Sequence, residues 1–276
     1  MLPTALVGVL SSGENERSEC FDALARQEGV SLTTFEVANK PNKVAHEQLY
    51  ERFMAEKEKY SVFVKVDADT VLTTPSAISE IAYSILNSRD FDHVVFPLYD
   101  WLSGSEVRGL NAFSDNAFWP KHDHQLFVDL KPQYPGRRVV MKGKAIGVHS
   151  PNPSFRQAFV FGYHRMLKVI QRGESAMRLM SAYRHARTIA NVFRQYEYFG
   201  DARRALALFG ALRASSSHEP VLIDKKAVMP SEEIAQELLS TDAAEVSDQL
   251  RPFFGRAINV FKLGVKSRLQ TPVEPR

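Results

Sequence analysis

Two carboxylates spaced by one residue, Asp67 and Asp69, are the side chains of this sequence that most directly suggest chemistry. They follow residues 62–66, a β-branched and aromatic run that is long enough for a buried strand and too short for an independent helix. In an open α/β sheet, ligands bind beyond the carboxyl ends of the strands. Two acids placed there repel each other unless a cation lies between them. The pair therefore predicts a divalent metal and, behind it, a phosphate-bearing ligand.

An Asp-x-Asp triplet also arises by chance in surface turns. Its flanking residues therefore decide whether this triplet is a metal-diphosphate site or a solvated turn. Residues 62–66 ahead of it are strand-like, and Thr74-Pro75 behind it can open a helix that runs through Ile85. A strand, an acidic pair and a helix start in succession favour a metal-diphosphate site over a solvated turn.

The elements expected around this pair alternate between strands and helices. Strands are predicted at residues 4–10, 32–37, 62–66, 92–98 and 145–149, and helices at 16–27, 44–60 and 75–86. Residues 99–109, rich in acids and aromatic residues, are expected to form a loop. This alternation is typical of an α/β fold with a mainly parallel sheet and right-handed crossovers.

The order of these elements resembles the nucleotide-sugar half of glycosyltransferases with the GT-A fold, particularly those of family 2. The resemblance spans about the first 150 residues and is carried by the turn at 11–16, the helix ending Leu24-Ala25-Arg26-Gln27 and the stretch 64–69. It implies a Rossmann-like mixed sheet flanked by helices in residues 1–154, followed by an α-helical region in 155–276. One departure is that the second strand ends at 35–39 without the Asp-Asp-Gly-Ser often found there.

By this resemblance, Asp67 and Asp69 hold Mn²⁺ or Mg²⁺ against the diphosphate of a sugar nucleotide, with Asp69 the more direct ligand. GT-A enzymes often add a histidine from late in the fold, and neutral imidazole binds Mn²⁺ well, so His149 is the third candidate ligand. The alternative for His149 is a hydrogen-bonded core histidine. His122 and His124 alternate on an expected strand and could face one way, but a solvated position is favoured for both.

Acids after the fourth expected strand are the candidates for catalysis. If the transfer inverts the anomeric centre, a carboxylate must lie within hydrogen-bond reach of the acceptor hydroxyl and take its proton. Asp100 is the first candidate, Glu106 the second, and Asp115 a further one. Trp101 could stack on a sugar ring or simply fill the core.

The donor nucleotide is expected at the ends of the first three strands. Ser11, Glu14 and Asn39 are predicted around the nucleoside, and Lys65 and Asp67 toward the phosphates. The implied activity is that of a metal-dependent hexosyltransferase of inverting type, acting in polysaccharide biosynthesis on a glycan or lipid-linked acceptor.

The region after residue 154 has helical periodicity throughout its first part. Ser154 can cap a helix from Phe155, Met177 to Tyr198 forms a second, and Asp201 can cap a third through Leu212. Gly173 is expected to break the first helix, and a flexible joint is expected near 214–218, followed by further helices and a disordered tail.

Charge is distributed unevenly along the 276 residues. Between Pro151 and Arg213 there are 11 Lys and Arg against 3 Asp and Glu, so this stretch carries +8 although the whole chain carries only +3. A basic module of this kind suggests an anionic partner, here a peripheral contact with an anionic membrane, whereas the alternative is a solvated helical face. No recognised nucleic-acid motif is present, so nucleic acid is not the expected partner.

Composition sets the remaining limits. No run of about 18 apolar residues exists, so no spanning helix is expected. A single cysteine, Cys20, excludes an internal disulfide and fits a cytoplasmic protein, with a position at the inner face of the membrane if the basic helices dock there.

Two competing functions are left open. A nucleotidyltransferase shares the sheet and the metal-diphosphate chemistry, but its first turn is usually Gly-rich and basic, whereas residues 11–17 hold one Gly and two acids. A non-catalytic binding protein would use the basic helices and leave the acidic pair without a role.

Overall fold

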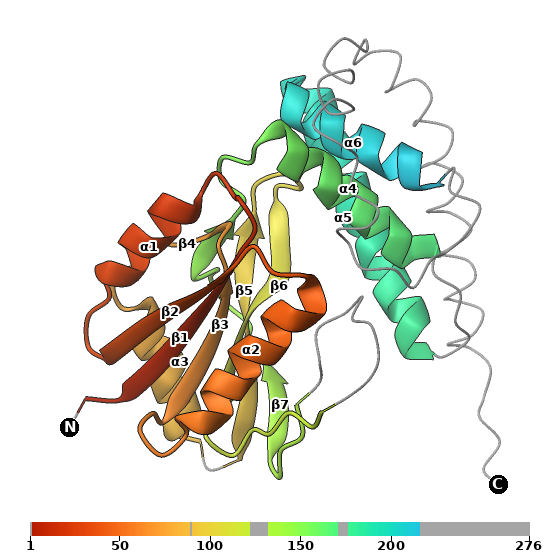
Figure 1. Cartoon of the computed structure of the whole chain (residues 1–276). Coiled ribbons are helices and arrows are strands. Elements are labelled where there is room, and N and C mark those ends of the chain that lie inside the picture. The colour runs from red at the N-terminus through yellow and green to blue at the C-terminus, as the bar shows by residue number, and fades with distance from the viewer. Residues whose placement is uncertain (1, 89, 122–131, 171–175, 216–276) are drawn as a thin grey trace, which may run out of the picture. The chain divides into compact units, whose positions relative to one another are not determined.

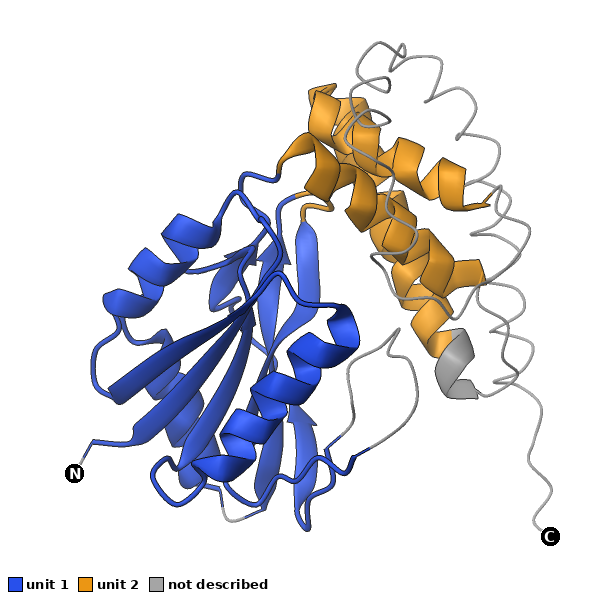
Figure 2. Cartoon of the chain, viewed as in Figure 1, with its two compact units in different colours: residues 1–101, 105–153, 222–228 blue, residues 102–104, 154–221, 229–276 orange. Residues whose placement is uncertain are grey.

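The computed structural model describes residues 2–88, 90–121, 132–170 and 176–215 (Figure 1). The chain divides into two compact units (Figure 2). Of the described residues, those up to Trp101 and from Ser105 to Pro153 belong to unit 1, while Leu102–Gly104 and the residues from Ser154 onward belong to unit 2.

Unit 1 is built on one eight-stranded mixed sheet with the order β2-β1-β3-β6-β5-β8-β4, and β7 pairs with β5. The strands are β1 (Thr4–Ser11), β2 (Ser31–Ala38), β3 (Val62–Asp67), β4 (Thr70–Leu72), β5 (Phe91–Asp100), β6 (Ser105–Ser114), β7 (Arg137–Val140) and β8 (Gly147–His149). Pairing is parallel between β1 and its neighbours β2 and β3, and between β5 and its neighbours β7 and β8. The predicted α/β class, with a mixed sheet flanked by helices, is confirmed.

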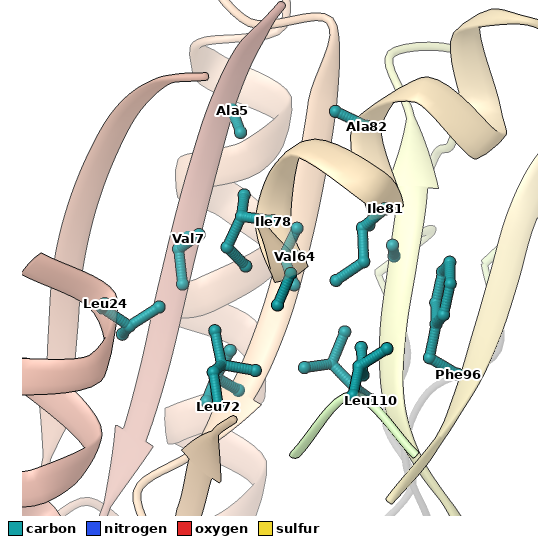
Figure 3. Close-up of a cluster of buried hydrophobic side chains, with 14 of the residues drawn as sticks. Ala5, Val7, Leu24, Val64, Leu72, Ile78, Ile81, Ala82, Phe96 and Leu110 are labelled. Carbon is teal, nitrogen blue, oxygen red and sulfur yellow. The ribbon is translucent and has the colours of Figure 1, made fainter. Parts of the chain in front are cut away.

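Helices pack on both faces of this sheet. α1 (Arg17–Ala25) and α3 (Ala77–Leu86) bury apolar side chains against one face, where Ile78 and Ile81 meet strand residues such as Val64 (Figure 3). α2 (Asn42–Ala55) packs on the other face through Tyr50 and Phe53, among others. The apolar residues of the central strands lie on both faces, which explains why β3 has no polar alternation until Lys65.

The expectation of a loop at residues 99–109 is wrong, because this segment is part of a β-hairpin. β5 continues to Asp100, and β6 returns antiparallel from Ser105. The register shifts opposite Phe96 and Pro97, so that Gly109 is an extra residue in β6 and the alternation of apolar residues is interrupted there. A Cβ on Gly109 would lie 2.2 Å from Leu98 Cδ1, which is why glycine occupies the bulge.

The same hairpin adds antiparallel pairs to the sheet. β6 runs antiparallel between β3 and β5, and β4 runs antiparallel to β8, so three of the seven strand pairings are antiparallel and four are parallel. β4 and β7 are too short, at three and four residues, to show a pattern in the sequence.

Unit 2 contains the helices α4 (Phe155–Ile170), α5 (Ala176–Phe199) and α6 (Ala202–Ser215). The predicted caps are confirmed: the Ser154 hydroxyl accepts the Gln157 amide N–H at 3.1 Å, and Asp201 Oδ1 accepts the Arg204 amide N–H at 3.0 Å. α6 continues to Ser215, so it includes the beginning of the joint expected near 214–218, and the rest of that joint lies outside the described residues. Gly173, the expected break after the first helix, also lies outside them.

α4 and α6 approach each other closely at two glycines. A Cβ on Gly162 would lie 1.6 Å from the Ala207 carbonyl oxygen, and one on Gly210 would lie 2.0 Å from that of Phe159. Only residues without a side chain allow the two backbones to pack at this distance. Among the described helices, none is both long and apolar enough to cross a membrane.

Candidate active site

Strand direction brings the predicted site residues of unit 1 to one edge of the sheet. β1, β2, β3, β5 and β8 all run the same way, since the two parallel sets are joined through the antiparallel β6. Their carboxyl ends are Ser11, Ala38, Asp67, Asp100 and His149. The edge at which these strands end is the place where ligands bind in open α/β sheets.

His149 lies between two carboxylates at this edge. Its Nδ1 is 2.7 Å from Asp100 Oδ1, and its Nε2 is 3.3 Å from Asp69 Oδ2. Asp100 pairs with His149 across β5 and β8, and Thr70 pairs with His149 across β4 and β8. The three side chains Asp100, His149 and Asp69 therefore form a line fixed by three strands.

Asp100 is fully buried within this line. A neutral His149 that donates its Nδ1–H to Asp100 presents the lone pair of Nε2 to the Asp69 carboxylate. Two acceptors so close together require a proton or a cation between them. The arrangement is therefore suited to binding a positive charge next to Asp69.

Ser150 holds Asp69 from a second direction. The Ser150 amide N–H donates to the Asp69 carbonyl at 2.6 Å, and its hydroxyl donates to Asp69 Oδ2 at 3.1 Å. Ser150 has φ +49°, a conformation that costs free energy for a non-glycine residue and is common at functional sites. Asp69 Oδ1 is buried and accepts no hydrogen bond from the described residues, so this carboxylate oxygen lacks the partner that a buried polar atom normally has.

Asp67 is placed differently from Asp69. It is exposed, and its Oδ1 lies 3.2 Å from Nζ of Lys65, whose side chain is buried on the same face of β3. Lys65 thus contacts the acidic pair directly. The two acids of the triplet have distinct partners: a lysine for Asp67, and His149 with Ser150 for Asp69.

Ser11 and Glu36 form a second group at the ends of β1 and β2. The Ser11 hydroxyl donates to Glu36 Oε1 at 2.5 Å, and the Arg17 guanidinium binds both Glu36 oxygens at 2.7 and 2.6 Å. The hydrogen bond from Arg17 is the main cause that lowers the pKa of Glu36 below its ordinary value. Glu36 therefore stays ionised at neutral pH and fixes Arg17 beside Ser11.

Glu14 and Asn39 shape the loops next to this group. Both Glu14 oxygens accept bonds from Ser12, one from its amide N–H and one from its hydroxyl, each at 2.6 Å. Asn39 has φ +55°, and its amide N–H donates to the Ser11 carbonyl at 2.9 Å. Asparagine tolerates this left-handed conformation better than most residues, which accounts for its position at the end of β2.

The edge of the sheet is electrostatically negative. Burial is the largest cause that raises the pKa of the Cys20 thiol to about 12, and the charges of four carboxylates add to it. These four carboxylates are those of Asp69, Asp67, Glu14 and Glu36. Their combined field favours cations at the strand ends.

The sheet separates the two candidate catalytic acids. Asp100 lies on the same face of β5 as Leu98, whereas Tyr99 and its partner Glu106 project from the opposite face. Glu106 is exposed, and Asp100 is buried against His149. The two acids therefore cannot act on the same hydroxyl from one side.

Asp115 lies far from both acids. It follows Ser114, which pairs with Val62 at the beginning of β3, whereas Asp67 is at the end of that strand. Because β6 runs antiparallel to β3, Asp115 sits at the opposite edge of the sheet. Asp115 is therefore not placed with the other candidate residues at the carboxyl ends of the strands.

Some functional candidates lie outside the prediction or outside the described residues. Sequence reasoning missed Glu36, Ser150 and Glu16, a buried acid whose Oε1 accepts the Asn152 amide N–H at 3.0 Å. The turn after His149 was a signal for Ser150, because a rigid Ser-Pro-Asn-Pro segment at a strand end places polar groups precisely. His122 and His124 lie outside the described residues.

The part of the chain that the structure describes contains no group of three His, Cys, Asp or Glu side chains that could hold a metal ion. Asp69 and His149 are the two predicted ligands that lie together, while Asp67 is turned toward Lys65. A metal here would thus take only part of its ligands from these side chains.

Of the comparisons with known proteins, the comparison with solved structures finds matches. No protein-family model matches the chain, and no curated protein matches it. A crystal structure of S. aureus TarS 1-349 in complex with UDP-GlcNAc is similar with a TM-score of 0.33 and 11% sequence identity, covering 98% of this chain and 92% of that chain. Similarity at this level carries no functional inference.

Proposed function

We propose that this protein is a metal-dependent glycosyltransferase that moves a hexosyl group from a nucleotide-diphosphate sugar to a hydroxyl acceptor. The observation that carries the proposal is the line of Asp69, His149 and Asp100 at the carboxyl ends of parallel strands, with Asp69 Oδ1 buried and accepting no hydrogen bond within the part of the chain that the structure describes. A buried carboxylate oxygen in this state is stabilised by a cation.

The side chains of Asp69 and His149 are suitable ligands for Mn²⁺ or Mg²⁺. Two neighbouring ligands of one cation with bonds of about 2.1 Å lie roughly 3 Å apart, close to the 3.3 Å between Asp69 Oδ2 and His149 Nε2. Mg²⁺ sites commonly use one or two protein ligands and fill the rest with substrate phosphates and water. Asp69 and His149 are the proposed protein ligands, and Asp67 joins them if it is released from Lys65.

When bound, such a metal would neutralise the negative charge that develops on the leaving diphosphate. The protein groups around it have separate tasks. Asp100 accepts the Nδ1–H of His149 and keeps Nε2 directed at Asp69, an outer contact that sets the orientation of a histidine ligand. Ser150 holds the Asp69 carboxylate in position.

This geometry supports a positioning role for Asp100. Asp100 is buried and hydrogen-bonded to His149, whereas Glu106, the other candidate base, is exposed on the opposite face of the sheet from Asp100. Trp101, whose amide N–H donates to the His149 carbonyl at 3.1 Å, is proposed to stack on a sugar ring.

The nucleoside is proposed to lie over the ends of β1 and β2. Ser11, Glu36 and Asn39 meet there, and Lys65 stands on β3 beside Asp67, where its ammonium group can contact a phosphate. Transfer of a nucleotidyl group is less well supported, because the Ser12 amide N–H that would have to bind a triphosphate is already bonded to Glu14.

The acceptor is proposed to be a glycan or a lipid-linked glycan. A lipid-linked acceptor would be met at the inner face of a membrane, and the +8 stretch between Pro151 and Arg213 is suited to a peripheral contact with anionic lipid.

Calorimetric titration of UDP and of GDP into the protein tests the proposal. With Mn²⁺ present, one nucleotide is expected to bind wild type, and binding is expected to be lost with a chelator and in Asp69→Ala. Asp115→Ala, at the other edge of the sheet, is the control and should bind like wild type. Equal binding by Asp69→Ala and wild type would reject the proposed site.

A further inference from the structure

One face of α5 carries a row of arginines. At about 100° per residue, positions 180, 184, 187, 191, 194 and 198 fall within about 80° of one another. We call this row the arginine face, and its members are Met180, Arg184, Arg187, Asn191, Arg194 and Tyr198. None of these described residues is acidic.

The opposite face of α5 is apolar and buried. Ala182, Ala186, Ile189 and Ala190 lie there and are all buried. Because the apolar face is already used within unit 2, the arginine face is the side that α5 presents outward. The side chains of Arg184, Arg187 and Arg194 are exposed.

Exposed apolar side chains stand at both ends of the arginine face. Met180 is 45% exposed near the beginning of the helix, and Tyr198 is 81% exposed at its end. Phe199, 59% exposed, packs edge-to-face on Tyr198 with 4.7 Å between ring centroids. Tyr198 and Phe199 thus form one contiguous exposed apolar group at the end of the arginine face, and contiguous apolar surface beside cations is a feature of interaction sites.

We propose that the arginine face of α5 is the surface through which this protein adsorbs to an anionic lipid bilayer. The 24 residues of α5 extend about 36 Å, so the face can lie along a membrane and its three arginines can contact several lipid phosphates at once. Tyr198 and Met180 suit the boundary between headgroups and acyl chains, where one end of a side chain is apolar and the other is hydrated.

Electrostatics favours an anionic surface over a neutral one. The described exposed charges of α5 are Arg184, Arg187 and Arg194 against Glu197. Glu197 lies about 60° around the helix from Arg194, the nearest member of the arginine face, and is therefore outside the row. Each arginine near an anionic bilayer is expected to increase partitioning roughly five-fold.

This inference rests on the membrane contact proposed above and not on the transfer chemistry. The Asp69→Ala variant is therefore expected to adsorb as wild type does. Adsorption and nucleotide binding can fail independently, so one result does not decide the other.

Vesicle co-sedimentation of the full chain is the test, with phosphatidylcholine vesicles compared with vesicles that also contain phosphatidylglycerol. Wild type is expected to prefer the anionic vesicles at low salt and to lose that preference at high salt. Replacing Arg184, Arg187 and Arg194 by glutamine should reduce partitioning about 100-fold. Glutamine retains helix propensity, and circular dichroism checks that α5 is intact.

The matched control removes three positive charges from unit 1, the same number that the arginine variant removes from α5. Lys57, Lys142 and Lys144 are exposed, and their replacement by glutamine should leave partitioning within about two-fold of wild type. Equal losses in both triple variants would show non-specific attraction and overturn the assignment. So would an absence of preference for anionic vesicles, or a stronger arginine-dependent affinity for duplex DNA than for the vesicles.

Discussion

The contact between Asp100 and His149 makes one carboxylate responsible for the orientation of a proposed metal ligand. Asp100→Asn removes the charge that holds the His149 ring, with little change in volume. Outer contacts of this kind typically account for about 10- to 100-fold in metal affinity, so Mn²⁺ should bind the variant more weakly by that factor. Electron paramagnetic resonance of free Mn²⁺ measures it.

Asp115→Asn serves as the comparison for this experiment, since it changes the same group at the other edge of the sheet. Its Mn²⁺ affinity should match that of wild type. If Asp100→Asn also matched wild type, His149 would not depend on Asp100 for its orientation.

His93 links stability to pH. Burial lowers the pKa of His93 to about 4, and its Nε2 lies 3.0 Å from Asn111 Oδ1. Because the unfolded value is near 6.5, the stability that the neutral ring provides is full above pH 6.5 and is lost as the pH falls toward 4. The loss amounts to about 3 kcal/mol over this interval.

Urea unfolding between pH 7.5 and pH 4 measures this dependence. His185, whose pKa burial lowers to about 2, acts in the same direction in unit 2. His93→Gln should therefore reduce the pH dependence without removing it. An unchanged dependence in the variant would mean that His93 is not held neutral in the folded state.

At the scale of elements, the tip of the β5–β6 hairpin is held by one arginine of α6. Arg204 Nε donates to the Leu102 carbonyl at 3.0 Å, and its Nη1 pairs with Asp201 at 2.5 Å. Arg204→Met leaves that carbonyl and that acid without these bonds, at a cost of about 3 kcal/mol. Chemical denaturation of the full chain measures the change.

Arg213→Met is the matched control, because Arg213 is an exposed arginine of the same helix. It should change stability by less than about 0.5 kcal/mol. Similar losses in the two variants would indicate a general effect of charge and not the buried contact to Leu102.

The packing of α4 against α6 gives a second prediction at this scale. Gly162→Ala places a methyl group where the Ala207 carbonyl oxygen stands, and a backbone atom cannot move aside without separating the helices. We expect a loss of more than about 3 kcal/mol, above the usual range for overpacking. Thermal unfolding followed by circular dichroism measures it, with Thr188→Ala, a change at a half-buried position of α5, as control.

For the molecule as a whole, ligand binding should appear as stabilisation. Mn²⁺ with the preferred nucleotide at about 100 times its dissociation constant should add about 2.7 kcal/mol to the folded state. Scanning calorimetry should show a higher melting temperature for wild type, reversed by a chelator. Asp69→Ala should show no shift, and a shift of equal size in that variant would place the ligand elsewhere.

Much of this architecture could be predicted from the sequence, because most of its strands and helices carry strong local patterns. β1, β2 and β3 are rich in apolar and β-branched residues, and the caps of α4 and α6 are explicit in Ser154 and Asp201. The hairpin could not be predicted in the same way, because the bulge at Gly109 shifts the alternation of β6.

In the candidate site too, local sequence patterns predicted some features and long-range pairing decided the others. Asp67, Asp69 and His149 follow recognisable strands, so their presence at one edge could be inferred from sequence. Their partners could not be inferred, because the contact of Asp100 with His149 depends on the pairing of β5 with β8, 49 residues apart in the chain. The supporting role proposed for Asp100 rests on this contact.

The division of the hairpin between the two units has a consequence for how this protein can be rearranged by recombination. Both strands belong to unit 1, but Leu102–Gly104 belong to unit 2, where Arg204 holds them. The chain thus enters the helical unit twice, and a single crossover after Pro153 would exchange the helices without the tripeptide that fits them. A chimera should keep its stability only when Leu102–Gly104 and α6 are inherited together.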